Sequence, residues 1–132
     1  NVANTGSVLV TVSDKDKAEV LPLIKRFYSL GFDIEATHGT SVFLEKAGIK
    51  NRERKRISDG SNEIPDAIRK GLINYGINTR DYGSADMNSD GNMIRRCAVE
   101  NNVTVFTSLD TVRALLDVLE EITMCVSTID AK

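Results

Sequence analysis

Hydroxyl, amide and cationic side chains come directly after the short apolar segments of this sequence, where the chain leaves each predicted strand. Backbone N–H groups at helix starts and nearby hydroxyls hold phosphate well, and lysine and arginine add point and forked charges. The pattern therefore predicts a pocket for a phosphorylated small anion, with the candidate residues Thr11, Lys17, Thr37, Thr40, Arg56, Asn78, Thr79 and Arg80. Loops are rich in the same residue types for other reasons, so plain helix capping is the competing interpretation.

Other kinds of site chemistry find less support. His38 lies beside two threonines, but no acidic residue is placed to orient it, so a turn histidine bonded to the backbone is an equal alternative. Cys97 is expected on a buried helical face and therefore inert, and Cys125 has no basic neighbour. A single histidine and two cysteines without a CxxC pair do not indicate a metal site. The pair Arg95-Arg96 is read as a solvated helix start, with a pocket or partner contact as the alternative.

Strand and helix patterns alternate along the chain and must position these residues. Short apolar or alternating runs predict the strands Ser7–Val12, Phe32–Ala36, Ile73–Asn78 and Val103–Phe106, and the polar stretch Arg54–Ser58 is interpreted as a further strand. Helical spacing predicts the helices Asp16–Leu30, Ser41–Ala47, Ile64–Leu72, Met93–Glu100 and Leu109–Ile122. This order predicts an α/β fold, a three-layer α/β/α sandwich around a five-stranded parallel sheet of Rossmann-like type. Gly76 is expected to weaken its strand, and the polar stretch Thr79–Asn92 is expected to be a functional or mobile loop.

Length and charge exclude several classes of protein. A chain of 132 residues, 27% of them charged, fits one globular domain. The net charge of −2 argues against nucleic-acid binding, and no apolar run is long enough for a membrane span or a signal peptide. Two cysteines fit a cytoplasmic location. We expect a linker remnant over residues 1–6, one domain over 7–123 and a tail over 124–132.

Several segments together resemble a known family. They are VLVTVSDKDK from Val8, GFDIEATHGTSVFLEKAGI from Gly31, ISDG from Ile57, INT from Ile77, DGNMIRRCAVENNV from Asp90 and TSLDT from Thr107. In these segments the chain resembles methylglyoxal-synthase-like (MGS-like) domains, most closely those at the C-terminus of carbamoyl-phosphate synthase large subunits. The resemblance runs from about Gly6 to Leu119 and implies the three-layer fold inferred above.

The resemblance also implies a regulatory role. Domains of this kind bind the nucleotides UMP and IMP as effectors, and many respond to ornithine nearer the junction with the catalytic domains of the same subunit. The parent enzyme, with its glutaminase small subunit, makes carbamoyl phosphate for pyrimidines and arginine, using ATP with Mg or Mn. The domain itself is expected to hold no cofactor and to carry no catalytic residue, and oligomer contacts are a further expectation.

Matching the family's motif residue by residue assigns roles within the predicted pocket. Lys17, Thr37 and Thr40 match the phosphate-binding positions, and Arg56 stands where a basic residue is common. Thr11, Asn78 and Thr79 match strand ends that face the nucleotide, whereas Arg80 departs from the usual small polar residue.

Two alternatives to this regulatory role belong to other classes. One is a lyase of the methylglyoxal synthase type, although Ser13 and Ser61 stand where that enzyme's motif has a histidine and an aspartate. The other is a structural or oligomerisation module without a ligand. The inosinate cyclohydrolase domain shares the expected fold, but the segments from Asp90 and Thr107 favour the synthase domain.

Overall fold

Five parallel strands form the centre of the protein in a computed structural model that describes residues 6–56, 60–79 and 90–130, with backbone alone for 90–92 and 124–130. The strands are β1 (Ser7–Thr11), β2 (Asp33–Thr37), β3 (Arg52–Arg54), β4 (Tyr75–Asn78) and β5 (Thr104–Phe106). Their order in the sheet is β3-β2-β1-β4-β5, and every neighbouring pair is parallel. This confirms the predicted five-stranded parallel sheet.

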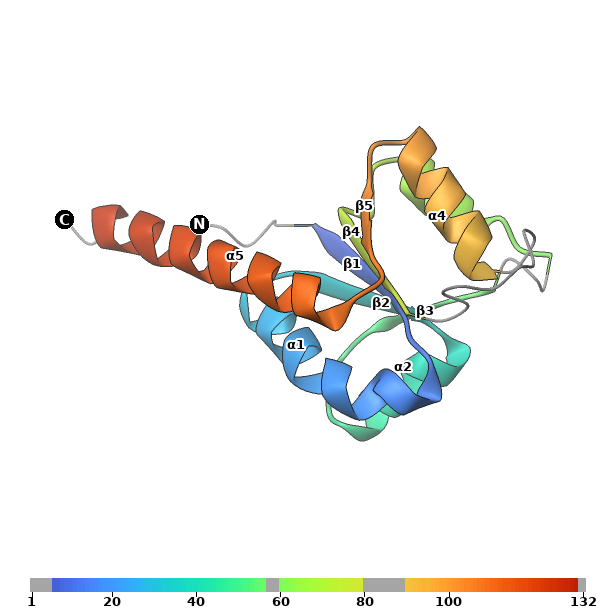
Figure 1. The fold of residues 1–132 in the computed structure, drawn as a ribbon, viewed down its shortest axis with the longest axis horizontal. Coiled ribbons are helices and arrows are strands. Elements are labelled where there is room, and N and C mark those ends of the chain that lie inside the picture. The colour runs from blue at the N-terminus through green and yellow to red at the C-terminus, as the bar shows by residue number, and fades with distance from the viewer. Residues whose placement is uncertain (1–5, 57–59, 80–89, 131–132) are drawn as a thin grey trace.

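Helices cover both faces of the sheet (Figure 1). A 3-10 turn η1 (Asp14–Asp16) leads into α1 (Lys17–Ser29), which shares one face with α2 (His38–Lys46) and α5 (Leu109–Asp130). The opposite face carries α3 (Glu63–Arg69) and α4 (Asp90–Glu100). The chain therefore forms the three-layer α/β/α arrangement that the sequence pattern predicts.

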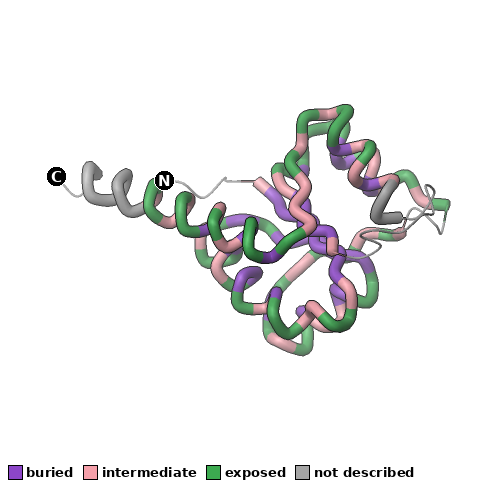
Figure 2. Tube along the Cα trace, viewed as in Figure 1, coloured by how far each residue is buried: buried purple, intermediate pink, exposed green. Residues whose placement is uncertain are grey.

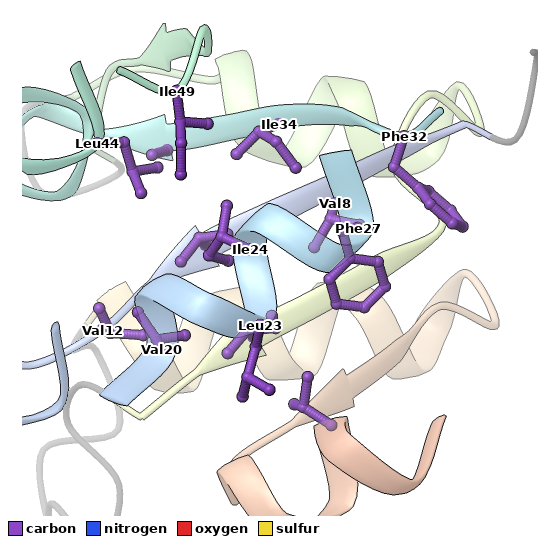
Figure 3. Close-up of a cluster of buried hydrophobic side chains, with 14 of the residues drawn as sticks. Val8, Val12, Val20, Leu23, Ile24, Phe27, Phe32, Ile34, Leu44 and Ile49 are labelled. Carbon is purple, nitrogen blue, oxygen red and sulfur yellow. The ribbon is translucent and has the colours of Figure 1, made fainter. Parts of the chain in front are cut away.

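Side-chain alternation along the central strand β1 divides the core in two. Val8 and Val10 point toward α1, α2 and α5, whereas Leu9 points toward α3 and α4. Figure 3 shows the larger cluster, in which Ile24 and Phe27 of α1 pack over the sheet. Burial is greatest along the inner strands and falls off toward the outer faces of the helices (Figure 2). A period-two pattern with both faces covered is what a buried parallel strand requires.

Helix ends follow the turn chemistry of the sequence. After α1 the chain turns at Gly31, whose φ is +99°, and the N–H of Phe32 bonds the carbonyl of Phe27 at 3.2 Å. After α4 the same role falls to Asn102, with a φ of +60° and a Val103 to Ala98 hydrogen bond of 2.8 Å. Both ends are Schellman motifs, in which a left-handed residue satisfies the last carbonyls of the helix.

Two predicted boundaries at the candidate site are wrong. The second helix begins at His38 rather than Ser41, because extended Thr37 is its N-cap and the residues that looked like a turn form its first turn. The third strand is Arg52–Arg54 rather than Arg54–Ser58. It begins early because Asn51 holds the preceding chain, accepting the Ser41 hydroxyl at 2.6 Å and donating to the Ile49 carbonyl at 3.1 Å.

The last helix is longer than predicted. We expected a helix over Leu109–Ile122 followed by a tail, whereas α5 continues to Asp130. No glycine or proline interrupts the sequence over this range, so nothing local ends the helix at Ile122. The division into residues 1–6, 7–123 and 124–132 stays a prediction. Most of the predicted loop Thr79–Asn92 lies outside the described residues, and Asp90 already begins α4.

Gly76 does not leave a gap in β4. A Cβ built on this residue would lie 3.1 Å from Cγ2 of Val105 on the neighbouring strand. The absence of a side chain therefore lets Val105 pack directly against the β4 backbone, and the expected weakening of the strand is replaced by close packing.

Candidate functional site

A cavity of about 430 Å³ lies where β1, β2 and β3 end, at the carboxyl edge of the sheet. Its walls come from the β1–α1 connection, from the start of α2 and from the residues after β3, and they are Val12, Ser13, Asp14, Lys17, His38, Gly39 and Arg56. In parallel α/β sheets this edge is where ligands bind. We refer to it as the α2 pocket.

Lys17 reaches across the α2 pocket from the first residue of α1. Its Nζ lies 3.9 Å from the position that a Cβ on Gly39 would take, so the ammonium rests on the first turn of α2. The same ammonium is ion-paired with the Asp14 carboxylate one turn earlier. The Lys17 side chain is 18% exposed, whereas that of Asp14 is 95% exposed. An anion that enters the pocket therefore meets a largely buried cation whose ion pair with an exposed carboxylate contributes little in water.

Two buried threonines belong to the helix start that Lys17 contacts. Thr37 is the N-cap of α2 and is 4% exposed, and Thr40 in the first turn is 1% exposed. Neither hydroxyl makes a side-chain hydrogen bond to any residue in the described part of the chain, and Thr37 makes no capping bond. Capping by Thr37, the competing interpretation of the sequence, is therefore wrong for this residue. Buried hydroxyls without partners are costly, so their presence at a helix N-terminus fits a site that a ligand completes.

Thr11 and Asn78 end the two central strands side by side. Their Cα atoms are register partners, and the Thr11 hydroxyl donates to Oδ1 of Asn78 at 3.1 Å. Both are buried, at 4% and 2% exposure. They place two buried polar side chains at the switch point of the sheet, between strands whose connections leave in opposite directions, but neither residue lines the α2 pocket.

Thr79 faces a different cavity from the one that holds Lys17. It lines a second cavity of about 340 Å³, together with Lys15, Asp16, Glu19, Thr107, Ser108, Leu109 and Asp110. Its hydroxyl accepts the backbone N–H of Ser13 at 3.2 Å. The structure thus brings Lys17 and Arg56 together in the α2 pocket. Thr37 and Thr40 lie at the start of α2 beside this pocket, and Thr79 lines the neighbouring cavity. Arg80 lies outside the described residues.

His38 has an acidic partner that the sequence pattern did not predict. Nδ1 of His38 lies 3.1 Å from Oε2 of Glu53 on β3, so this histidine does have an acid to orient it. The pair joins residues 15 positions apart, because β2 and β3 are adjacent and Ala36 lies opposite Glu53. Only the strand pairing reveals this contact. Asp14 was also missed, although its spacing of three from Lys17 is a helical pairing signal.

The remaining candidates for chemistry are less exposed to a ligand. Cys97 is partly buried on α4, where burial raises the pKa of its thiol, in keeping with the inert role predicted for it. Ser61 accepts the N–H of Glu63 at 3.1 Å and so serves the start of α3. Among the residues that the structure describes, no three histidine, cysteine or acidic side chains gather as a metal site. No described helix is long and apolar enough to cross a membrane.

Fold and site together define a class: an α/β domain with a parallel sheet whose carboxyl edge carries a polar pocket over a helix N-terminus. The MGS-like domain family matches residues 19–107 of the sequence. The chain therefore belongs to the MGS-like domain family, which confirms the resemblance drawn from its motifs. Thr11 and Lys17 precede the matched range.

Known relatives give the same assignment. The chain is 42% identical over 120 residues to the carbamoyl phosphate synthase large chain of Helicobacter pylori strain ATCC 700392 / 26695, and 41% identical to that of strain J99 / ATCC 700824. These matches cover 91% of this chain but 11% of each relative, so the chain spans about a ninth of their length.

A solved structure supports the fold. Methylglyoxal synthase from Elizabethkingia anophelis NUHP1 superposes with a TM-score of 0.67 over 84% of this chain and 76% of that chain, at 17% sequence identity. At this identity the likeness speaks for the architecture and not for the chemistry of the pocket.

Proposed function

We propose that this chain is the regulatory domain of a carbamoyl-phosphate synthase large subunit and that it binds a nucleoside monophosphate in the α2 pocket. The similar proteins support the assignment to this enzyme, because both are carbamoyl phosphate synthase large chains. The phosphate would lie on the N-terminal turn of α2, between Lys17 and Arg56. UMP and IMP are the effectors that we propose, in pyrimidine and arginine biosynthesis.

One observation carries the phosphate assignment. The hydroxyls of Thr37 and Thr40 are buried without hydrogen bonds to described residues, at the N-terminus of a helix whose first turn supports the Lys17 ammonium. A phosphate supplies oxygens to hydroxyls, ammonium and helix N–H groups at once, and the helix dipole favours its negative charge. Helix capping alone leaves these two buried hydroxyls unexplained.

Proton abstraction is less well supported than binding. The carboxylate that lines the α2 pocket belongs to Asp14, and it is ion-paired with Lys17. Ser61, at the position where the lyase motif has its aspartate, bonds the backbone of α3. We therefore propose no catalytic residue in this domain. Incubation with dihydroxyacetone phosphate should release no methylglyoxal, and a rate above the uncatalysed one would favour the lyase.

The wider assignment follows from the same membership. We propose that the effector signal passes to the catalytic domains of the same large subunit, which works with a glutaminase small subunit in the cytoplasm. Effectors change activity only by binding two conformations of the synthase unequally, with coupling typically of ~1–3 kcal/mol. Ornithine is a further proposed effector, and ATP with Mg or Mn belongs to the parent enzyme. Contacts between copies of the domain are the structural alternative, and the mass of the chain in solution with and without UMP tests it.

Calorimetric titration with UMP and IMP tests the pocket. Lys17→Met should weaken binding by ~10-fold or more, because a charge-assisted contact to phosphate contributes about 1.5–3 kcal/mol. Lys25→Met is the matched control, since Lys25 is exposed on the same helix and outside the cavity. Unchanged affinity in Lys17→Met, or equal losses in both variants, would show that the phosphate binds elsewhere.

A further inference from the structure

Asp16 belongs to a hydrogen-bond network between the ends of β1 and β4 that is joined at Ser13. The Oδ2 atom of Asp16 accepts the Ser13 hydroxyl at 2.7 Å. Thr79 in turn accepts the backbone N–H of Ser13 at 3.2 Å. The pKa of Asp16 lies below its usual value, chiefly because the Ser13 hydroxyl stabilises the charged form of the carboxyl group. We call these three residues the Asp16 network.

The network lies in the wall between the two cavities. Ser13 lines the α2 pocket, whereas Asp16 and Thr79 line the neighbouring cavity. It also crosses the switch point of the sheet, because Ser13 follows β1 and Thr79 follows β4. The wall is therefore fixed by side-chain bonds from a strand on one side and a 3-10 turn on the other.

Asp16 directly precedes Lys17 and ends the turn η1. Its backbone N–H bonds the Ser13 carbonyl at 3.0 Å, so backbone and side chain both tie the turn to Ser13. Lys17 begins α1 at the next residue and projects over Gly39. Greater conformational freedom of η1 would extend to the backbone of Lys17. A pocket whose cation is not held in place binds its anion more weakly, because the side chain must be ordered on binding.

We propose that Asp16 is a positioning residue, whose carboxylate holds η1 to Ser13, itself bonded to Thr79, so that Lys17 is set for phosphate in the α2 pocket. This inference rests on the proposed function and adds how the affinity of that pocket is maintained. A negative charge beside an anion site opposes binding by itself. The positioning role and the bare charge of Asp16 therefore predict opposite results when the carboxylate is removed.

The test is calorimetric titration of the chain with UMP. Asp16→Ala removes charge and acceptors together and should raise the Kd about tenfold, the scale of one charge-assisted hydrogen bond. Asp16→Asn keeps one acceptor oxygen and should fall between Asp16→Ala and the unaltered chain. Thr79→Val breaks the network from the β4 side, and the double variant with Asp16→Ala should bind no more weakly than the weaker single variant.

Controls separate this role from general destabilisation. Val105→Ala removes the side chain that packs against Gly76 between β4 and β5, outside both cavities, so it should lower the melting temperature while leaving the Kd unchanged. Exchange of the Ser13 backbone amide with deuterium should become faster in Asp16→Ala. A Kd in Asp16→Ala that is equal to or lower than that of the unaltered chain overturns the positioning role while the proposed function stands. If the unaltered chain binds neither UMP nor inorganic phosphate, the proposed function fails and this inference falls with it.

Discussion

Replacing Thr40 by valine should make the unliganded protein more stable and its phosphate pocket weaker. The Thr40 side chain is 1% exposed, and its hydroxyl has no hydrogen bond within the described residues. Valine has nearly the same shape, and burying a hydroxyl without a partner costs about 1–3 kcal/mol. We take the lower end and expect the free energy of unfolding to rise by about 1 kcal/mol. For a chain of this length the melting temperature should rise by about 3–5 °C.

The gain should reverse in the presence of ligand. A hydrogen bond to a charged phosphate contributes about 1.5–3 kcal/mol, so the Kd for UMP should rise about 10- to 100-fold in Thr40→Val. Thermal melts without UMP and with millimolar UMP measure both effects on the same samples. The unaltered chain should melt below the variant without UMP and above it at saturating UMP.

Matched variants make this prediction sharp. Thr111 is the third residue of α5 as Thr40 is of α2, but it is exposed, so Thr111→Val should change neither stability nor affinity appreciably. Thr40→Ser keeps the hydroxyl and should retain most of the affinity. If Thr40→Val lowered the melting temperature and left the Kd for UMP unchanged, the hydroxyl would be a structural group and not part of a ligand site.

Three further predictions concern neighbouring residues. Asp14→Asn removes the carboxylate that competes for Lys17, so the Kd for UMP should fall by up to about fivefold, the equivalent of the ~0.2–1 kcal/mol that an exposed ion pair contributes; a rise would mean that Asp14 helps to hold the ligand. Gly76→Val adds a side chain only 3.1 Å from Val105 and should cost about 1–3 kcal/mol in urea unfolding, with Val105→Ala restoring part of it. The pKa of Asp16 is lower in the folded protein than its usual value of 3.8, so the charged carboxylate stabilises the fold at pH values above 3.8. This contribution disappears as the pH falls through the lower, folded-state pKa. Between pH 5 and 2.5 the free energy of unfolding should therefore fall less in Asp16→Asn than in the unaltered chain; equal slopes would contradict the shifted pKa.

Alternation of strand and helix was enough to predict the fold, because buried parallel strands and amphipathic helices leave strong local patterns. The weak point was β3, an edge strand of charged residues. Its place depends on tertiary contacts, including the Arg54 to Glu35 hydrogen bond of 2.6 Å between two largely buried side chains. The start of α2 was misplaced for a related reason, since Thr37 and Gly39 favour a turn locally and become a helix start where α2 packs against β2, β3 and α1.

Within the candidate site, proximity of strand ends was predictable and side-chain pairing was not. Thr11 and Asn78 meet because both end adjacent parallel strands, which the fold class implies. The contact between His38 and Glu53 depends on which strand lies next to β2, and that order is not written in local spacing. Thr79 illustrates the same limit, since its place at a strand end was predicted and the cavity that it lines was not.

The central claim is that this chain recognises the phosphate of a nucleotide, and a thermal-shift titration with UMP, IMP and uridine tests it most directly. A ligand at ~100 times its Kd adds about 2.7 kcal/mol, which for a domain of this size raises the melting temperature by roughly ten degrees. We predict a shift of that order with UMP or IMP, none with uridine, and at most about half of that shift with either nucleotide in Lys17→Met, whose Kd is expected to be about tenfold higher or more. No shift with either nucleotide, or an equal shift with uridine, would contradict a phosphate-centred regulatory site.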